Sequence, residues 1–332
     1  MSTYRALKGY SIKSISSDPP NPKEGQIWYN NSAMALKIRP TIQAFSSGGT
    51  IPQIVRGGGS GGTQTAAWIA GGLQYPGDTK NKTWTYDGSS WTAGNNLPAN
   101  YFIGGSTAPD SAGLIFDGHA SYGPGTGTYE WDGTDWTAGG NITAAGPGGS
   151  QGITGTGTQT AALGIGGIGD PPNSGTPRVL QYDGSSWSEG TATPGNTGGA
   201  AGDGPNSATW IGGGHEQTTE SYEYDGSSWT TSGDLNYACP QGINAQGWGP
   251  QTAAIIAGGT SSAPTSSKSQ LYDGTSWAQG PSLSTTRQNN AMSSQMAGTR
   301  TGFVTGGYHT SGNTGNTEEF NEAETTRTID VS

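Results

Sequence analysis

A short motif that recurs along the chain constrains the fold more than any other feature of the sequence. An aromatic residue is followed by Asp-Gly, by two further polar residues and then by Trp. The aromatic and Trp positions of its five copies are Tyr86 and Trp91, Trp131 and Trp136, Tyr182 and Trp187, Tyr224 and Trp229, and Tyr272 and Trp277. Asp-Gly favours a tight β-hairpin turn, because the turn needs positive φ angles that Gly adopts freely and Asp tolerates. Each copy therefore predicts a hairpin whose flanking aromatic residues pack across the strands or onto a neighbouring sheet.

The spacing of the copies indicates a repeat architecture. A degenerate sixth copy, Phe320-Asn321-Glu322, lacks the Trp. The Asp or Asn positions are 87, 132, 183, 225, 273 and 321, at intervals of 42 to 51 residues. These intervals lie in the range of β-propeller blades.

A second signal precedes each motif: a β-prone run that ends in glycines. The pairs are Gly71 and Gly72, Gly166 and Gly167, Gly212 and Gly213, Gly258 and Gly259, and Gly306 and Gly307, while residues 113–118 hold the place in the second repeat without a pair. Consecutive glycines let two backbones approach where a Cβ would clash, as near a crowded axis. One repeat therefore predicts four strands, the second ending in the glycines, the third in the aromatic residue, and the fourth starting at Trp.

A glycine pair followed by a Tyr and then by a Trp resembles the kelch repeat. The resemblance spans residues 57–331 and implies an all-β fold, a six-bladed kelch-like β-propeller, to which we assign residues 46–332. Residues 325–331 are then expected as its last strand, closing the ring against the blade that starts near Ile51.

Residues 1–45 carry no copy of the repeat and predict a small β-hairpin anchoring segment. Strands are expected around residues 6–15 and 26–29, followed by a turn and a strand over residues 34–38, with Trp28 and Tyr29 as anchor residues. Such a stretch is too small to hold a stable core alone, so we expect it to fold onto a partner or a neighbouring subunit.

The segment Ser17 to Asn30 (SDPPNPKEGQIWYN), followed by Leu36-Lys37, is similar to segments in structural proteins of tailed phages that infect marine bacteria. The resemblance implies a virion structural protein, made in the host cytoplasm, as a tail fibre or another external appendage for host attachment. It also implies that residues 1–45 bind other virion proteins, that the chain is multimeric in the particle, and that the propeller meets host surface glycan or protein.

Composition and charge limit the alternatives. Gly 60 and Pro 19 are typical of low-complexity chains, but eleven Trp and fourteen Tyr must be buried at regular points. Residues 1–56 hold seven Lys and Arg against two acidic residues, although the net charge of the chain is −10. We therefore expect a basic segment that docks to an acidic surface, and an acidic head that repels nucleic acid. No apolar run is long enough to suggest membrane insertion.

Several residue groups could carry chemistry, and each has a simpler structural interpretation. Tyr237 and Cys239 resemble the cross-linked pair of copper radical oxidases but lack matched imidazoles, and His119, His215 and His309 follow glycine strands too far from an axis to share zinc. Residues 164–169 match the dinucleotide fingerprint by letters, without a following helix. The Asp residues of the turns could bind calcium, but turn geometry already explains them. We expect no catalytic, metal or cofactor site, and no enzyme.

Two alternatives to an attachment appendage remain open. One is a glycan-binding module, with Trp68, Trp210, Trp248 and Tyr308 as candidate platforms. The other is purely structural decoration of the particle. Loops of varying length, such as residues 73–85 and 168–181, would carry recognition on one face of the ring.

Overall fold

The computed structural model describes residues 12–329 except residues 24, 76–80, 103, 108, 119–124, 143–150, 169–174, 215–217, 239–246, 260–265, 289–290, 293–300, 310–311 and 325–326. Over these residues the regular structure is entirely β, so no helix that could span a membrane is found there. The chain divides into two compact units, which are Phe45–Phe320, and Met1–Ala44 together with Asn321–Ser332.

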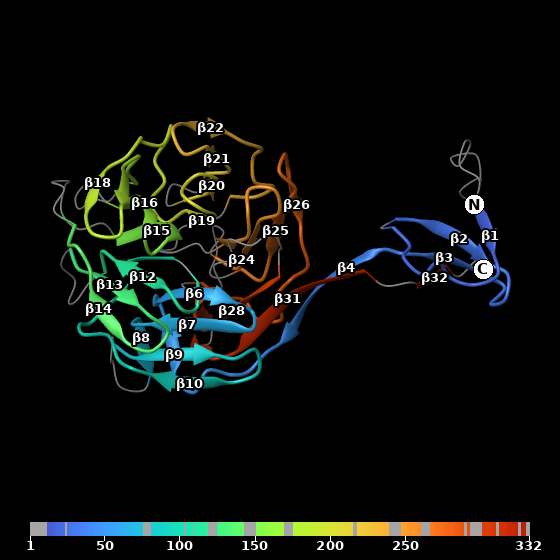
Figure 1. Ribbon diagram of the computed structural model, residues 1–332, viewed down its shortest axis with the longest axis horizontal. Helices are drawn as coiled ribbons and strands as arrows, with labels where there is room; N and C mark the ends of the chain where they lie inside the picture. The colour runs from blue at the N-terminus through green and yellow to red at the C-terminus, as the bar shows by residue number, and fades with distance from the viewer. Residues whose placement is uncertain are drawn as a thin grey trace. The chain divides into compact units, whose positions relative to one another are not determined.

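Six four-stranded sheets can be described along the larger unit, and the first five follow one another in the sequence (Figure 1). The first holds β6(Gly59–Thr63), β7(Ala66–Ala70), β9(Thr83–Tyr86) and β10(Trp91–Gly94); the second β11(Gly105–Thr107), β12(Gly113–Phe116), β13(Thr128–Trp131) and β14(Trp136–Ala138); the third β15(Gln151–Thr158), β16(Ala161–Ile168), β17(Val179–Tyr182) and β18(Trp187–Glu189); the fourth β19(Ala201–Asp203), β20(Thr209–Gly212), β21(Ser221–Tyr224) and β22(Trp229–Thr231); the fifth β23(Gly247–Trp248), β24(Ile255–Ala257), β25(Ser269–Tyr272) and β26(Trp277–Gln279). Two short ladders lie outside them, β5(Ile54–Arg56) with β8(Leu73–Tyr75), and β29(Tyr308–His309) with β30(Gly312–Asn313).

Each of these five sheets is an antiparallel meander whose third and fourth strands meet at the repeated motif. The aromatic residue and the Trp are direct cross-strand partners, as in Tyr86 with Trp91 and Tyr182 with Trp187. The Asp-Gly turn lies between them, and Gly88 has a φ of +90°. The sequence prediction of strands ending and starting at these aromatic residues is therefore confirmed.

The core consists of apolar clusters between sheets, and the clusters close on themselves. Trp68 and Ile115 belong to a cluster of the first and second sheets, and the pattern continues from sheet to sheet. The cluster that contains Ile69, Tyr86 and Phe303 joins the first sheet to the sixth. This succession gives an all-β, β-propeller-like fold, in agreement with the expected class.

The sixth sheet is completed by the N-terminal part of the chain. It holds β27(Ala291–Met292), β28(Gly302–Thr305), β31(Thr317–Glu324) and β4(Thr41–Ser47), with β4 next to β31. The expectation of a last propeller strand over residues 325–331 is wrong, because Arg327–Ile329 pairs elsewhere and residues 325, 326, 330 and 331 lie outside the described part. Phe320-Asn321-Glu322 has no Asp-Gly turn, so β31 runs on for eight residues without reversing. The outer position is therefore left for β4.

The smaller unit is a four-stranded sheet built from both ends of the chain. Its strands lie in the order β1(Lys13–Ile15), β2(Ile27–Asn30), β3(Ala35–Ile38) and β32(Arg327–Ile329). The expected hairpin is β2 with β3, in which Ile27 pairs with Ile38. Strand β1 pairs in parallel with β2, and the part of the expected first strand before residue 12 lies outside the described residues. The expected segment 1–45 thus gains a C-terminal strand, and residues 41–45 extend into the sixth sheet.

Candidate functional site

The Asp residues of the repeated motif stabilise their own turns. Oδ1 of Asp87 accepts hydrogen bonds from the backbone N–H groups of Ser89 (2.9 Å) and Ser90 (2.7 Å). The same two bonds form at Asp132, Asp183, Asp225 and Asp273. These bonds, led by the one from Ser186, lower the pKa of Asp183 to about 2. The turn itself therefore explains these carboxylates, as the sequence suggested in place of calcium binding.

The Trp residues of the motif bind the preceding sheet. Their indole Nε1 groups donate to a hydroxyl on the first residue of the third strand there, as Trp136 does to Thr83 (2.9 Å) and Trp187 to Thr128 (2.8 Å). Trp91 and Trp277 donate in the same way to Thr317 and Ser221. The third strand of the third sheet begins with Val179, and Trp229 donates instead to the carbonyl of Thr191.

The Tyr residues of the motif make a matching set of contacts. The hydroxyl of Tyr182 donates to Glu130 (2.6 Å) and that of Tyr272 to Glu223 (2.8 Å), both one sheet earlier. Tyr86 donates to Glu319 (2.6 Å), and the hydroxyl of Tyr224 accepts from Gln181 (3.3 Å). Each acceptor or donor immediately precedes the motif aromatic of its own sheet.

The two remaining positions of this series carry residues that need no such partner. By its place in the series, Thr85 of the first sheet corresponds to the motif that begins with Trp131. Leu271 of the fifth sheet corresponds to the motif that begins with Phe320, and the two share an apolar cluster. Trp131 and Phe320 have no hydroxyl. Sequence reasoning missed this correspondence, although the residue before each motif aromatic was visible as a signal.

The glycine pairs lie where one sheet meets the chain that leads into the next. A Cβ on Gly71 would come within 2.6 Å of the carbonyl oxygen of Tyr101, four residues before β11. The N–H of Gly72 donates to that oxygen (2.7 Å), and the N–H of Gly307 donates to Val55 in the same way (2.9 Å). Positive φ angles of +69° and +78° at Gly71 and Gly72 bring the backbones together.

Two repeats depart from the expected glycine positions. In the fourth sheet the residues with positive φ are Gly213 and Gly214, and Gly212 is the last residue of β20, so the expected pair is shifted by one. In the second sheet Asp117, with a φ of +56°, and Gly118 follow β12 at the place of the pair. Gly166 with Gly167, Gly258 with Gly259, and Gly306 with Gly307 all have positive φ.

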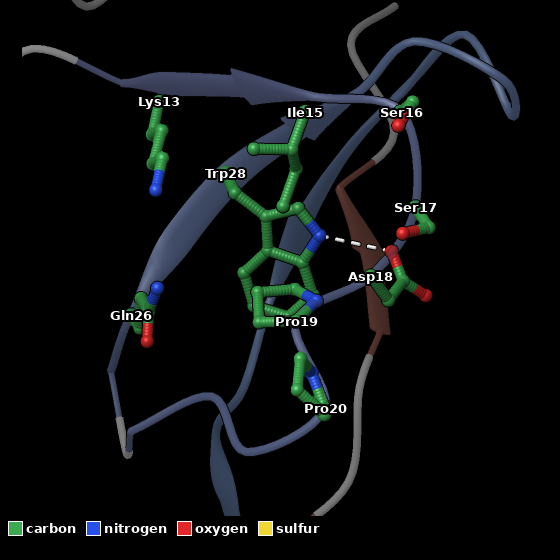
Figure 2. A pocket seen from close by; sticks show the side chains of 9 residues that line it. All are labelled: Lys13, Ile15, Ser16, Ser17, Asp18, Pro19, Pro20, Gln26 and Trp28. Carbon is green, nitrogen blue, oxygen red and sulfur yellow. Dashed lines mark hydrogen bonds between the residues drawn. The ribbon is translucent and has the colours of Figure 1, made fainter.

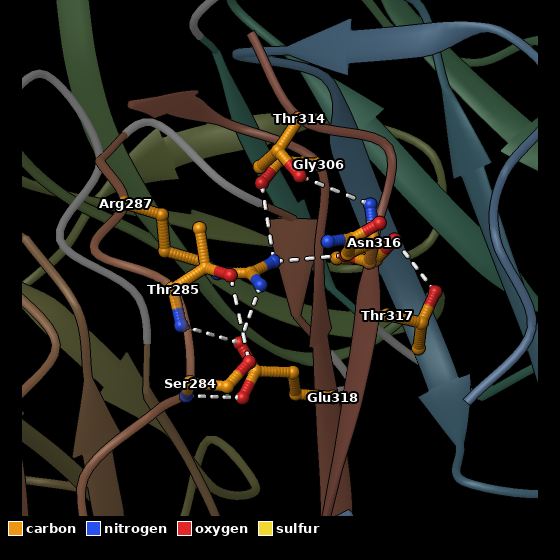
Figure 3. A network of polar contacts seen from close by, with 9 residues as sticks. Ser284, Thr285, Arg287, Gly306, Thr314, Asn316, Thr317 and Glu318 are labelled. Atoms are coloured by element: carbon orange, nitrogen blue, oxygen red, sulfur yellow. Dashed lines mark hydrogen bonds and ion pairs between the residues drawn. The ribbon is translucent and has the colours of Figure 1, made fainter. Parts of the chain in front are cut away.

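A buried ion pair in the sixth sheet was not anticipated (Figure 3). Arg287 donates to Glu318 across 2.6 Å, and the two side chains are 0% and 4% exposed. Arg287 also donates to the carbonyl oxygens of Asn316 (2.9 Å) and Gly306 (3.3 Å). Glu318 accepts from the backbone N–H of Ser284 (2.6 Å). Arg287 lies four residues before β27, where the equivalent residues before β6 and β11 are Val55 and Tyr101.

Most of the aromatic residues considered as glycan platforms are buried in the structure. Trp68, Trp210 and Trp248 are at most 1% exposed, which removes them as glycan platforms. Tyr308 lies half-buried beside Arg56, whose guanidinium carbon is 5.9 Å from the ring centroid.

The dinucleotide-like motif, the histidines and the thiol lie partly outside the described residues. Residues 164–168 continue strand β16 and so begin no helix, while Gly169 lies outside the described residues. His119, His215 and Cys239 also lie outside them, and His309 is described only as part of β29. The ring of Tyr237 faces Lys268, whose Nζ is 5.0 Å from its centroid. Among the described residues no three His, Cys, Asp or Glu side chains gather as a metal site requires.

In the small sheet, Asp18 organises a buried Trp. The Trp28 indole donates to Oδ1 of Asp18 (2.9 Å), and Asn30 donates to the same oxygen (2.7 Å) (Figure 2). These bonds, with Asn30 first, and the charge of Lys37 lower the pKa of Asp18. Beside Trp28 is a cavity of about 510 Å³, lined by Lys13, Ile15, residues 16–20 and Gln26.

The two expected anchor residues point to opposite faces of this sheet. Trp28 is fully buried, whereas Tyr29 is 37% exposed. Tyr29, Ile12 and Met34 are the large apolar side chains found exposed in the described part of the chain, and all three belong to the small unit. The repeat residues, in contrast, are engaged with neighbouring sheets. The small sheet is therefore the candidate binding site.

No protein-family model matches this chain, and no curated protein matches it. Among solved structures, it is similar to YjhT with a TM-score of 0.60 and 15% sequence identity. The match covers 85% of this chain and 99% of YjhT. At this identity the likeness concerns the fold alone, and it supports a propeller-like architecture.

Proposed function

We propose that this chain is a non-enzymatic structural protein of a phage particle, in which a six-bladed, kelch-like propeller is displayed externally. The six described sheets are its blades, and the small sheet attaches it to other particle proteins. The closed succession of six inter-sheet clusters supports the blade count. Attachment to the host surface is the role we assign to the displayed propeller.

The observation that carries the proposal is the division of roles between the two units. The small unit holds strands from near both ends of the chain, a cavity, and the large apolar side chains found exposed among the described residues. Its unit carries seven Lys and Arg against five Asp and Glu, whereas residues 45–320 carry seven against nineteen. A weakly basic attachment unit and a strongly acidic displayed unit fit an appendage whose head stays soluble and repels its neighbours.

The resemblance of residues 17–37 to phage structural proteins gives this attachment unit its proposed context. Within that segment, Asp18, Trp28 and Asn30 form the hydrogen-bonded centre of the small sheet. The residues that carry the resemblance are thus the ones that build the sheet.

The test is to locate the chain in purified virions by mass spectrometry and by immunogold labelling with an antibody against the propeller. We expect labelling at an external appendage. We also expect that a chain lacking residues 1–40 and 327–332 is made but not incorporated. Absence of the chain from virions of the phage that encodes it would refute the structural role.

Glycan binding is a weaker proposal, because three of its four candidate platforms are buried. A glycan array probed with the purified protein distinguishes the two roles of the propeller. The two predicted loops are shorter than expected, because β8 and β9 take up residues 73–75 and 83–85, and β16 and β17 take up residues 168 and 179–181. Binding that survives replacement of residues 76–82 and 169–178 would place recognition away from these loops.

A further inference from the structure

The cavity of the small unit lies on the face of the sheet that carries Trp28. Side chains alternate between the two faces of a strand, and paired residues of neighbouring strands share a face. Lys13 and Lys37 both pair with Trp28. Ile15 pairs with Asn30, two residues after Trp28. Lys13, Ile15 and Trp28 also line the cavity, so the cavity belongs to this face.

The opposite side of the sheet, which we call the Tyr29 face, is a separate feature. Tyr29 pairs with Ser14 on β1 and with Leu36 on β3. None of these three described residues lines the cavity. A ligand of the cavity therefore contacts the sheet on the other side from the exposed ring of Tyr29.

One side of the cavity carries hydrogen-bond donors and a positive charge. Lys13 is exposed, and it forms no ion pair with any residue that the structure describes. Gln26 accepts a hydrogen bond from the backbone N–H of Lys23 at its amide oxygen (2.8 Å), which leaves its amide nitrogen as a donor. In the close view Lys13 and Gln26 lie on the same side of the indole, and Asp18 lies on the other (Figure 2). The Lys13 side of the cavity therefore fits a negatively charged acceptor.

The acidic residue that lines the cavity is already engaged. Oδ1 of Asp18 accepts from Asn30 (2.7 Å) and from the indole of Trp28 (2.9 Å). These bonds, with Asn30 first, and then the charge of Lys37 lower the pKa of Asp18. The charge of Asp18 is thus compensated by its own partners, whereas the charge of Lys13 is left for a ligand.

Strand β1 is also an open edge of the sheet. The described strands lie in the order β1, β2, β3 and β32, so β1 has a described neighbour on one side only. An edge strand presents unpaired backbone N–H and C=O groups, to which an extended segment of another protein can add as a further strand. The side chains of the added strand alternate between the faces in step with β1. Residues placed beside Lys13 and beside Ile15, two positions apart, then lie on the cavity side.

We propose that the β1 edge binds an extended segment of another particle protein, in which an acidic residue and an apolar residue are two positions apart. The carboxylate binds the ammonium group of Lys13 and the amide of Gln26, and the apolar side chain packs beside Ile15. The inference rests on the proposed attachment role of the small unit, and it names the chemistry of the partner. An acidic partner also matches the excess of basic residues in this unit, seven Lys and Arg against five Asp and Glu.

The experiment is a titration of the isotope-labelled full chain with short peptides, followed by amide NMR. The probe is the peptide Val-Thr-Glu-Thr-Val with both ends blocked, whose Glu and Val side chains lie on one side of an extended chain in either orientation. The comparison peptide carries Gln in place of Glu. We expect the largest shifts at residues 13–15 and at Gln26. We expect a dissociation constant about fivefold lower for the Glu peptide, as for one charge-assisted hydrogen bond in a partly exposed site.

Substitutions at Lys13 test the carboxylate contact. Lys13→Gln should bind the two peptides equally, and Lys13→Glu should prefer a peptide with Lys in place of Glu. The matched control Lys23→Gln removes the same charge from an exposed residue outside the cavity lining, and it should keep the wild-type preference. The amide spectrum of β2 and β3 shows whether the sheet remains formed in each variant.

Three results overturn the proposal: no binding at millimolar peptide, equal binding of the Glu and Gln peptides by the wild type, or a preference that persists in Lys13→Gln. The titration uses the purified chain alone, so its outcome is separate from that of the virion experiment. A chain that is found in virions but does not bind the peptide keeps its structural role and loses only this contact.

Discussion

The two units of this protein differ in how the faces of their β-sheets are covered. In the propeller each apolar cluster lies between two sheets, so every sheet is supported by the next. In the small sheet one face is closed by the Asp18 loop and the Tyr29 face is left half-covered. Because the propeller sheets repeat, each of them packs against a neighbouring sheet of similar shape. The single small sheet has no such repeat beside it.

The units also differ in how the chain ends are used. Strand β4 belongs to the sixth sheet, whereas β1, β2, β3 and β32 belong to the small one. The apolar clusters of the propeller consist of residues from the range 45–320. We therefore expect the stabilities of the two units to be separable at the residue level.

The largest expected effect comes from cutting the chain on either side of β4. Removal of residues 1–45 takes away most of β4, including Phe45, whose ring packs 5.3 Å from that of Phe320. We expect that chain to aggregate or to melt far below full length, because the β31 edge and Phe320 become exposed. The predicted boundary between residues 45 and 46 thus cuts through β4(Thr41–Ser47).

The matched truncation removes residues 1–40 and 327–332 and keeps β4. The thermal transition of this shortened chain should stay cooperative and close to that of the full chain, as followed by circular dichroism and calorimetry. Equal melting of both truncated chains would show that β4 adds nothing to the propeller.

The second effect concerns the buried ion pair. Arg287→Met leaves Glu318 buried without its partner, and this should lower the free energy of unfolding by about 3–5 kcal/mol. Urea denaturation measures this change in the free energy of unfolding. The surface pair of Arg178 and Glu189, with side chains 20% and 55% exposed, is the control.

For Arg178→Met the expected loss is below about 1 kcal/mol. The double variant Arg287→Met with Glu318→Leu should regain part of the stability, because no charge then remains buried. A double variant as unstable as the single one would mean that the ion pair is not the source of the effect.

A third, smaller effect tests the contacts between neighbouring sheets. Tyr182→Phe removes the hydrogen bond to Glu130 and should cost about 1 kcal/mol, measured by urea denaturation. Phe320 is fully buried beside Leu271, which cannot accept a hydrogen bond, so Phe320→Tyr should also lower the free energy of unfolding, by burying a hydroxyl there. A gain in stability from Phe320→Tyr would contradict the matched series.

The same tyrosines predict a pH dependence. Burial first, and then the bond to the Glu, raises the pKa of Tyr86, Tyr182 and Tyr272 to about 12. A pKa raised on folding stabilises the folded state below the unfolded value of 10 and loses that contribution as pH rises toward 12. Stability should therefore fall between pH 10 and 12, and less steeply in a triple Tyr→Phe variant.

The smallest effect concerns a single turn. Asp183→Ala removes two hydrogen bonds to the backbone of one exposed hairpin, so the melting temperature should fall only slightly. Calcium should change the melting temperature of neither protein. A rise with calcium that Asp183→Ala abolishes would identify the turn carboxylates as calcium ligands after all.

Much of the propeller was predictable because its signals are local. Asp-Gly needs only its own backbone geometry to form a turn, and the flanking aromatic residues are direct partners across it. The positions of most glycine pairs were also correct, because positive φ is a property of single residues. Residues 212–214 are three successive glycines, and there the predicted pair lies one residue before the pair that has positive φ.

The sequence by itself determined the repeated hairpins and the number of motif copies. Only the tertiary structure decided which strand fills the vacant place after β31, because β4 is far away in sequence and strand pairing over such a distance carries no local signal. The same holds for Arg287 with Glu318, whose partners come together only when the chain leading into β27 meets β31. Tyr29 and Trp28 look alike as neighbouring aromatic residues, and alternation in a sheet whose last strand is C-terminal sends one into the core and the other to solvent.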